Sequence, residues 1–235
     1  MFQGKRKAIT FSYDDGVTQD KRLVEIFNKY GLKATFNLNS GLLGQGGTLV
    51  RKGVTVDHNK VTAADVPYVY AGHEIAAHTL THPFLPRAED DEVVRQVEQD
   101  RFALSELWGE EVVGFAYPGG GVNFDDRVVE LIRTRTGVRY ARTTLSCDSF
   151  VPGTDLFRFR PTVYHHEEWG RMLELAERFL ALQPEQPSIL YIWGHAYEFD
   201  VDNNWEAFEE FCKRISGAPD VFYGTNREVL LGDRK

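Results

Sequence analysis

Strand-like and helix-like segments alternate along almost the whole chain. Apolar runs rich in β-branched and aromatic residues predict strands over 8–13, 34–38, 74–77, 112–116, 140–143, 157–163, 188–193 and 221–225. Helical spacing of apolar residues predicts helices over 20–30, 89–108, 125–135, 167–182 and 205–215. Repeated strand–helix units favour a parallel α/β architecture, and about seven or eight of them favour a barrel over an open sheet. We therefore expect a distorted (β/α)7-8 barrel, with residues 1–235 as a single domain.

The stretch from Gly41 to Lys60 interrupts this alternation. It is rich in glycine and has no sustained apolar period, so we expect an irregular excursion or a small hairpin there.

Composition and charge exclude several classes of protein. The 235 residues carry 35 acidic and 27 basic side chains, a net charge of −8, and no Lys/Arg block, so we expect no nucleic-acid partner. Cys147 and Cys212 form no C-x-x-C pair. No apolar stretch reaches the ~18 residues of a membrane span. The N-terminal residues lack the apolar core of a signal peptide, which predicts a cytoplasmic protein without a membrane partner.

Polar motifs follow directly on four of the expected strands. They are Asp14-Asp15, the pair His78 and His82, the segment Tyr117-Pro118-Gly119, and His195. In parallel barrels the chemistry gathers where strands end at their C-terminal edge. We therefore expect these four segments, far apart in sequence, to converge on one rim.

The residue types at that rim predict a metal site. One carboxylate and two imidazoles can hold a divalent cation and leave a position open for water. Zn²⁺ is the natural choice for this donor set, with Co²⁺, Ni²⁺ or Mn²⁺ as alternatives. The second carboxylate would then be free to act as a base, and His195 could protonate a leaving group. Each motif alone also has a plain explanation, since Asp-Asp-Gly is ordinary turn chemistry and buried histidines often bond to backbone.

These motifs together resemble the polysaccharide deacetylase family (carbohydrate esterase family four, with the nodulation-type chitooligosaccharide deacetylase homology domain). Residues 12–16, Ser-Tyr-Asp-Asp-Gly, resemble its first motif, Thr-Phe-Asp-Asp-Gly. Residues 78–82 match its second motif, His-Ser/Thr-x-x-His. Residues 115–120, Phe-Ala-Tyr-Pro-Gly-Gly, resemble its third, which usually reads Arg-Pro-Pro-Tyr-Gly, and the strand ending at His195 resembles the fifth.

The resemblance implies a distorted barrel that removes acetyl groups from N- or O-acetylated sugars. It implies that Asp14 is the general base, that His195 is the general acid, and that the backbone N–H of Gly119 helps to stabilise the oxyanion. The implied ligands of the single metal ion are Asp15, His78 and His82.

Two departures from the family pattern affect the groups that support the site. Ala116 stands where the family usually has an arginine that tethers the base, and we expect Arg158 or Arg160 to supply that charge from a neighbouring strand. The fourth motif is not clearly present, and Asp148 is the nearest candidate to orient the general acid.

Some residues are expected to contact substrate or support the catalytic groups. These are Tyr117, Pro118, Asp148 and Arg160.

Two other functions stay open at this point. The same scaffold could hydrolyse a non-sugar amide such as a cyclic imide or ureide, which the absence of a signal peptide favours. A non-catalytic, carbohydrate-binding relative is the other alternative, favoured by the altered third and fourth motifs. The partner expected is an acetylated carbohydrate or another small amide. The sequence does not predict the oligomeric state.

Overall fold

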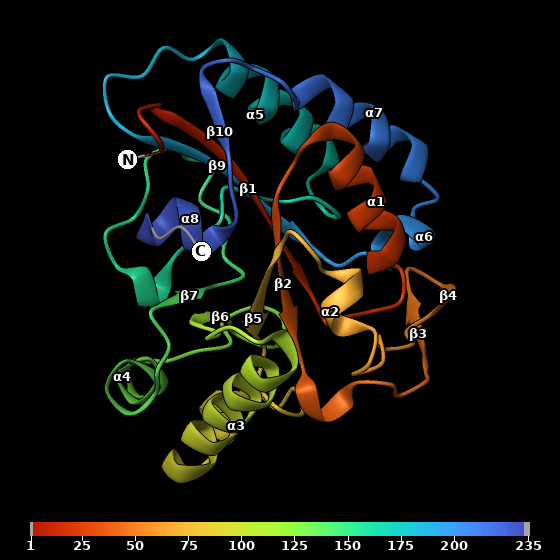
Figure 1. The fold of residues 1–235 in the computed structure, drawn as a ribbon, viewed down its shortest axis with the longest axis vertical. Coiled ribbons are helices and arrows are strands. Elements are labelled where there is room, and N and C mark those ends of the chain that lie inside the picture. The colour runs from red at the N-terminus through yellow and green to blue at the C-terminus, as the bar shows by residue number, and fades with distance from the viewer. Residues whose placement is uncertain (1, 233–235) are drawn as a thin grey trace.

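Parallel strands form a curled, barrel-like sheet at the centre of the molecule (Figure 1). The structure is a computed structural model that describes residues 2–232. The strand order is β7-β6-β5-β2-β1-β9-β8, and β10 pairs with the start of β1. The strands are β1 (Lys7–Asp14), β2 (Ala34–Leu38), β5 (Glu74–Ala77), β6 (Gly114–Ala116), β7 (Tyr140–Arg142), β8 (Val163–Tyr164), β9 (Ser188–Gly194) and β10 (Val221–Tyr223). The expected distorted barrel in a single domain is therefore confirmed.

The two edges of this sheet meet through a single bridge. Phe159, just before β8, pairs with Arg142 of β7. The Phe159 N–H donates to the Ala141 carbonyl at 3.0 Å, and its own carbonyl accepts from the Thr143 N–H at 2.9 Å. The strand predicted over 157–163 is wrong for most of its length, because Leu156–Arg158 form a 3-10 turn (η3) and β8 begins only at Val163. Pro161 lies between them and has no N–H to donate to a neighbouring strand.

Helices cover the outside of the sheet (Figure 1). Their apolar stripes face inward, as those of α1 show with Leu23, Ile26 and Phe27 all buried. The long helices are α1 (Asp20–Tyr30), α3 (Asp90–Trp108), α4 (Asp126–Arg135), α5 (Trp169–Ala181) and α7 (Trp205–Ile215), close to the predicted bounds. Short helices are α2 (Val66–Val69), α6 (Glu198–Val201) and α8 (Asn226–Leu231), and 3-10 turns occur at η1 (Ser40–Leu42) and η2 (Leu85–Arg87). Among residues 2–232, no helix has the length and apolar character needed to cross a bilayer.

The glycine-rich excursion contains a two-stranded hairpin outside the main sheet. Strands β3 (Thr48–Arg51) and β4 (Val54–Asp57) pair antiparallel. Lys52 and Gly53 form the turn with φ values of 49° and 77°, the positive angles that a tight hairpin turn requires. The hairpin is tied to the barrel where Lys60 bridges Val17 and where Gln19 donates to the Asp57 carbonyl at 2.8 Å.

Candidate functional site

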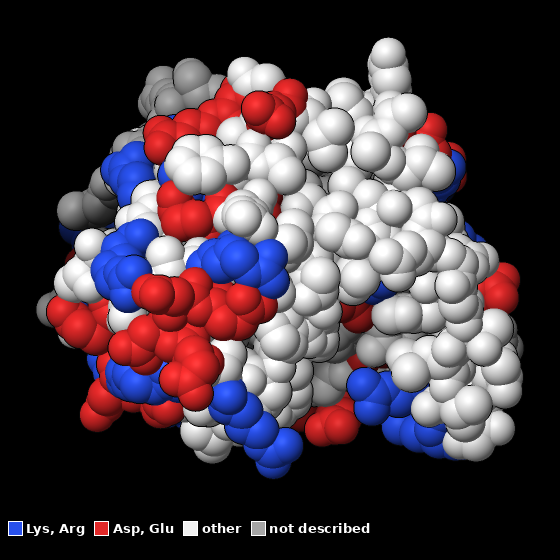
Figure 2. Space-filling view, turned by 90° about the horizontal axis from the view of Figure 1, so that it is seen from below, with Lys and Arg blue, Asp and Glu red and all other residues white. Residues whose placement is uncertain are grey.

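The rim formed by the C-terminal ends of the strands contains a cavity of about 380 Å³. The register of the sheet sets the ends of β1, β2, β5 and β9 side by side, since Asp14 pairs with Asn37, Leu38 with Ala77, and Tyr13 with Gly194. Figure 2 shows a face where charged side chains gather over one half, while the other half is mostly uncharged and hollowed, with acidic atoms inside the hollow. The predicted residues that line the cavity are Asp14, Asp15, His78, His82, Gly119 and His195.

Asp15, His78 and His82 form a group suited to a metal ion. One donor atom from each lies within 4.8 Å of the other two. The Asp15 Oδ1 is 3.9 Å from His78 Nε2 and 3.7 Å from His82 Nε2. Burial lowers the pKa of His78 to about 4, which makes it a neutral imidazole at physiological pH, the form that binds metals. Its Nδ1 lies 2.8 Å from the Ala116 carbonyl, which leaves Nε2 facing Asp15. Two imidazoles and a carboxylate fit Zn²⁺ and related ions.

The backbone around these three residues is held in unusual conformations. Asp15, Thr79 and His82 have φ values of 82°, 69° and 60°, in the left-handed region that costs free energy for side chains other than glycine. The buried amide of Asn39 compensates, because it donates to the carbonyls of His78 at 2.6 Å and Thr79 at 2.8 Å. The Thr79 hydroxyl also accepts the His82 N–H at 3.1 Å. The loop thus presents both histidines in a fixed arrangement.

Asp14 is held by a different set of partners. The Arg142 Nη2 donates to both of its carboxylate oxygens, at 2.6 and 2.5 Å, and the Asn37 amide donates at 2.7 Å. Both members of the ion pair are buried, with Arg142 0% and Asp14 2% exposed. The guanidinium also stacks over Trp193, 4.5 Å from the ring centroid. The Asp14 carboxylate is therefore oriented by Arg142 and Asn37, and it lines the cavity.

Arg142 corrects the prediction that Arg158 or Arg160 tethers Asp14. Arg158 instead pairs with Asp155 and Asp126, and Arg160 donates to the carbonyls of Leu145 and Ser146. Arg142 lies directly opposite Ala116 in the β6–β7 pairing. The positive charge that the family places in the third motif is therefore supplied here by the neighbouring strand β7. The signal available in the sequence was that Arg142 is a charged residue at the end of an expected strand.

His195 is held by Glu198, three residues further along the chain at the start of α6. Its Nδ1 lies 3.0 Å from Glu198 Oε1, and its backbone N–H donates to Oε2 at 2.8 Å. Burial lowers the pKa of His195, but the Glu198 charge raises it more, to about 9. Burial likewise raises the pKa of Glu198, and the charge of His195 and its hydrogen bonds outweigh this and keep it well below its usual range. His195 is therefore protonated at neutral pH.

Glu198 corrects the prediction that Asp148 orients His195. Asp148 pairs with Arg171 at 3.4 Å. Glu198 also meets His165 Nε2 at 3.0 Å and accepts the Tyr164 hydroxyl, so it is fixed from several sides. The spacing of three residues between His195 and Glu198 was the signal in the sequence, because residues three apart meet across a turn, and here the Glu198 N–H donates to the His195 carbonyl at 3.2 Å.

Gly194 makes room for this arrangement at the end of β9. A Cβ atom there would lie 1.7 Å from the Cδ2 of His165 and 1.9 Å from its Nε2. Only glycine leaves space for the imidazole against the strand.

The third motif contributes backbone more than side chains. Gly119 has a φ of 88° and lines the cavity with Gly120 and Gly121. The buried Asn123 amide donates to the carbonyls of Tyr117 at 2.8 Å, Pro118 at 3.0 Å and Gly119 at 2.8 Å, which fixes the loop. The Tyr117 ring is fully buried and its hydroxyl donates to the Phe157 carbonyl, so neither Tyr117 nor Pro118 lines the cavity.

Two residues of the excursion, which sequence reasoning missed, contact Asp15. His58 Nε2 lies 3.1 Å from Asp15 Oδ2, and Lys60 Nζ lies 3.8 Å from Oδ1. Burial raises the pKa of Asp15, but the bond from His58 and the charge of Lys60 outweigh it and hold the pKa well below its usual range. No sequence period pointed to these residues, because the hairpin that carries them lies outside the strand–helix repeat.

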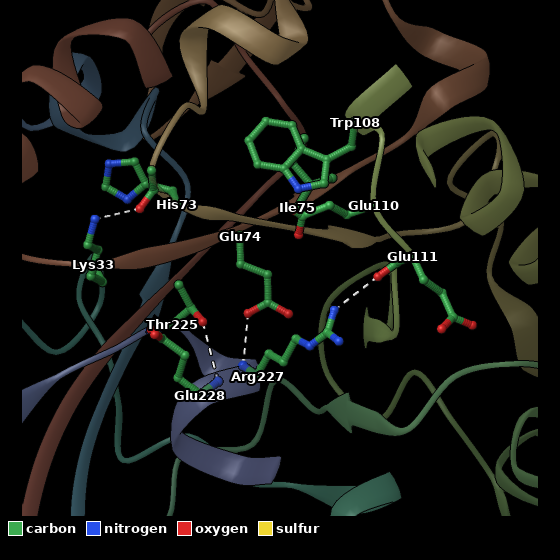
Figure 3. Close-up of a pocket in the computed structure, with 11 residues that line it drawn as sticks. Lys33, His73, Glu74, Ile75, Trp108, Glu110, Glu111, Thr225, Arg227 and Glu228 are labelled. Atoms are coloured by element: carbon green, nitrogen blue, oxygen red, sulfur yellow. Dashed lines mark hydrogen bonds between the residues drawn. The ribbon is translucent and has the colours of Figure 1, made fainter. Parts of the chain in front are cut away.

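A second cavity, of about 280 Å³, lies at the opposite ends of the strands (Figure 3). Glu74, at the start of β5, accepts the N–H of Arg227 from α8, while the Arg227 side chain donates to the Glu111 carbonyl. Trp108 lines the same cavity. None of the predicted site residues lies there.

Comparison with protein families gives one match. The family model described as polysaccharide deacetylase matches residues 3–141. No curated protein matches the chain.

Several solved structures share the fold. A putative polysaccharide deacetylase from Mycobacterium smegmatis is 17% identical with a TM-score of 0.64, over 97% of this chain and 90% of that one. A family 4 carbohydrate esterase from Streptomyces lividans, in complex with acetate, is 15% identical with a TM-score of 0.56, over 94% and 92%. A family 4 pseudoenzyme from Bacillus anthracis is 19% identical with a TM-score of 0.58, over 97% and 66%. The matched part spans 61–68% of the length of four of the matched structures.

Proposed function

This chain belongs to the polysaccharide deacetylase family, and on that premise we propose that it is a metal-dependent hydrolase that removes an acetyl group from an N- or O-acetylated sugar. The observation that carries the proposal is the grouping of an ion-paired Asp14, a two-histidine, one-carboxylate donor set and a protonated His195 around one cavity. The acetate bound to the Streptomyces lividans esterase supports an acetyl substrate by analogy.

The metal would be held by Asp15, His78 and His82, with Zn²⁺ as the first choice. When bound, such an ion supplies Lewis acidity, which polarises a carbonyl and lowers the pKa of a water molecule. His58 and Lys60 would hold the Asp15 carboxylate in place without entering the donor set.

The side chains beside that donor set supply the proton transfers. Asp14 would accept a proton from the attacking water, since Arg142 balances its charge and fixes its orientation. His195 would donate a proton to the departing amine or alkoxide, because it is charged at neutral pH. The Gly119 N–H would donate to the oxyanion that develops on the acetyl oxygen.

Acetate release tests this proposal. Chelated protein, reloaded with Zn²⁺ or Co²⁺, is assayed on chito-oligosaccharides and acetylated xylan, with a cyclic imide and a ureide in the same panel. We expect acetate release only with metal, and a loss in kcat of about 10²–10⁴-fold in Asp14→Asn, the usual contribution of a general base.

Asp148→Asn is the matched control, because Asp148 lies in an ion pair away from the cavity and its variant should keep wild-type turnover. Undiminished activity of Asp14→Asn would remove the base assignment. Turnover of the cyclic imide or ureide without acetate release would favour the non-sugar amide, and metal uptake without any turnover would favour a pseudoenzyme.

A further inference from the structure

The β3–β4 hairpin forms one wall of the proposed catalytic cavity. Leu49, Arg51 and His58 line the cavity from the hairpin and the residue that follows it. Side chains alternate along a strand, so Leu49 and Arg51 share the cavity face while Val50 between them is 64% exposed to solvent. The hairpin thus sets which chemical groups the cavity offers on that side.

Contacts to the barrel hold this wall in position. The His58 ring packs edge-on against Tyr197 with 5.2 Å between ring centroids, and its Nε2 contacts Asp15. At the turn, Lys52 pairs with Asp202 at 3.3 Å. The contacts of His58 anchor the base of the hairpin, so Arg51 is presented to the cavity by a fixed element, whereas the exposed Lys52–Asp202 pair at the turn contributes little.

Arg51 is a cavity-lining cation that has no counter-ion among residues 2–232. It interacts with the Tyr197 hydroxyl, and no Asp or Glu carboxylate of residues 2–232 lies within 4.0 Å of its guanidinium. Asp14 is paired with Arg142, and Glu198 with His195. A guanidinium presents several N–H donors in a planar fork that matches a carboxylate.

Glu167 adds an acidic side chain to the lining of the cavity. It lines the cavity from the segment before α5 and forms no ion pair with Arg51. An anionic group is therefore favoured on the hairpin side and disfavoured near Glu167.

We propose that the substrate is an acetylated sugar that carries a carboxylate, which Arg51 of the hairpin binds. This inference rests on the proposed function and narrows it to acidic sugars. A cavity of about 380 Å³ is within the range that holds a small ligand.

Two substrates that differ at one group test the proposal. N-acetylglucosaminuronic acid has a carboxylate where N-acetylglucosamine has a hydroxymethyl group. For the zinc-loaded protein we expect kcat/KM to be at least tenfold higher for the acid. Arg51→Gln should lower kcat/KM for the acid by about 10–100-fold, the loss of one charged hydrogen-bonded contact, mainly through KM, and should lower kcat/KM for the neutral sugar much less, so that the preference for the acid disappears. Arg51→Lys should recover part of the loss.

Lys52→Gln is the matched control. It removes a positive charge one residue away, but Lys52 does not line the cavity, so the preference for the acid should persist. An equal preference in the wild type and Arg51→Gln, or an equal loss in Lys52→Gln, would overturn the role of Arg51.

A binding measurement separates this inference from the proposed function. Calorimetry on zinc-loaded Asp14→Asn measures the affinity for both sugars without turnover. Tighter binding of the acid that disappears when Arg51→Gln is added supports the inference even where no acetate is released, in which case only the proposed reaction fails. Equal affinity for both sugars, in a protein that does release acetate, overturns only the inference.

Discussion

Asp14 and Asp15 are neighbours in sequence, yet their side chains have different partners. Asp14 faces Arg142 and Asn37, which fix both of its oxygens. Asp15 faces His58, Lys60 and the two histidines of the loop after β5. The positive φ of Asp15 turns the chain between the two carboxylates. This local geometry allows one of them to be a metal ligand while the other stays paired with an arginine.

Removing Arg142 should leave the buried Asp14 carboxylate without a counter-ion, with the Asn37 amide as its remaining donor. We expect Arg142→Met to lower the free energy of unfolding by about 3–5 kcal/mol, the usual cost of breaking a buried ion pair. Urea unfolding of the metal-free protein measures this loss. In an Asp14→Asn background the same substitution should cost much less, because no unpaired charge remains. Equal losses in both backgrounds would mean that Arg142 stabilises the protein by packing on Trp193.

The Glu198 carboxylate should set the alkaline limit of activity. The pKa of His195 is raised to about 9, so the protonated acid is lost as pH rises through that value. By linkage, the stability that this pair contributes is complete below the ordinary histidine pKa of about 6.5 and is lost as pH rises through about 9. In Glu198→Gln we expect the descending limb of kcat/KM to move at least about one pH unit lower.

The pH profiles of kcat/KM are recorded at equal metal loading for the wild type and Glu198→Gln. Glu174→Gln, on the exposed face of α5, is the control and should keep the descending limb at the wild-type pH. If the descending limb of kcat/KM stays at the same pH in Glu198→Gln, that limb reports the titration of a group other than His195.

The sequence motifs predicted the candidate catalytic and metal-binding residues, but not the side chains that hold those residues in place. Asp14, Asp15 and the histidine pair stand out because two polar motifs directly follow apolar strands. Arg142 could not be assigned, because its role depends on the pairing of β7 with β6 opposite Ala116. Asp148 was the wrong partner for His195, because the structure uses Glu198 within the same turn of chain and places Asp148 beside Arg171.

Among the elements, β9 carries the tightest packing requirement near the site. We expect Gly194→Ala to lower the free energy of unfolding by about 1–3 kcal/mol, because the new methyl group would overlap the His165 ring. Gly170→Ala near the start of α5 is a matched control with no atom within 4 Å of the added Cβ, and it should be neutral or slightly stabilising. Chemical denaturation compares the two, and equal stabilities would mean that His165 moves aside freely.

Element boundaries followed the sequence where one period dominated. The spacing of apolar residues over 20–30 and 89–108 gave α1 and α3 almost to the residue. The strand predicted over 157–163 was wrong for most of its length, because Phe157 lies in a 3-10 turn and Phe159 forms only an isolated bridge to β7. Residues 41–60 show no apolar period, so a hairpin and an irregular excursion were both expected there, and the structure has the hairpin. That this segment contributes Arg51 and His58 to the cavity was not predicted.

At the scale of the molecule, parallel strands separate the two ends of the barrel. The C-terminal ends of the strands hold the candidate site. At their N-terminal ends, α8 contacts the buried Glu74. Convergence of distant motifs could be predicted because every strand of a parallel barrel ends on the same side. The bridge between Arg142 of β7 and Phe159 before β8 could not be predicted, since it forms only once the curled sheet brings its two edges together.

Metal binding should stabilise the whole molecule, because its ligands come from the end of β1 and from the loop after β5. At a Zn²⁺ concentration 100 times the Kd, the gain in the free energy of unfolding is about 2.7 kcal/mol. For a domain of this size that corresponds to a rise in Tm of roughly 5–11 °C. Differential scanning calorimetry with chelator and with Zn²⁺ measures the shift, which Asp15→Asn should greatly reduce and Asp148→Asn should leave intact. A shift of the same size in Asp15→Asn would place the ion elsewhere, and the donor set at the rim would then lose its role.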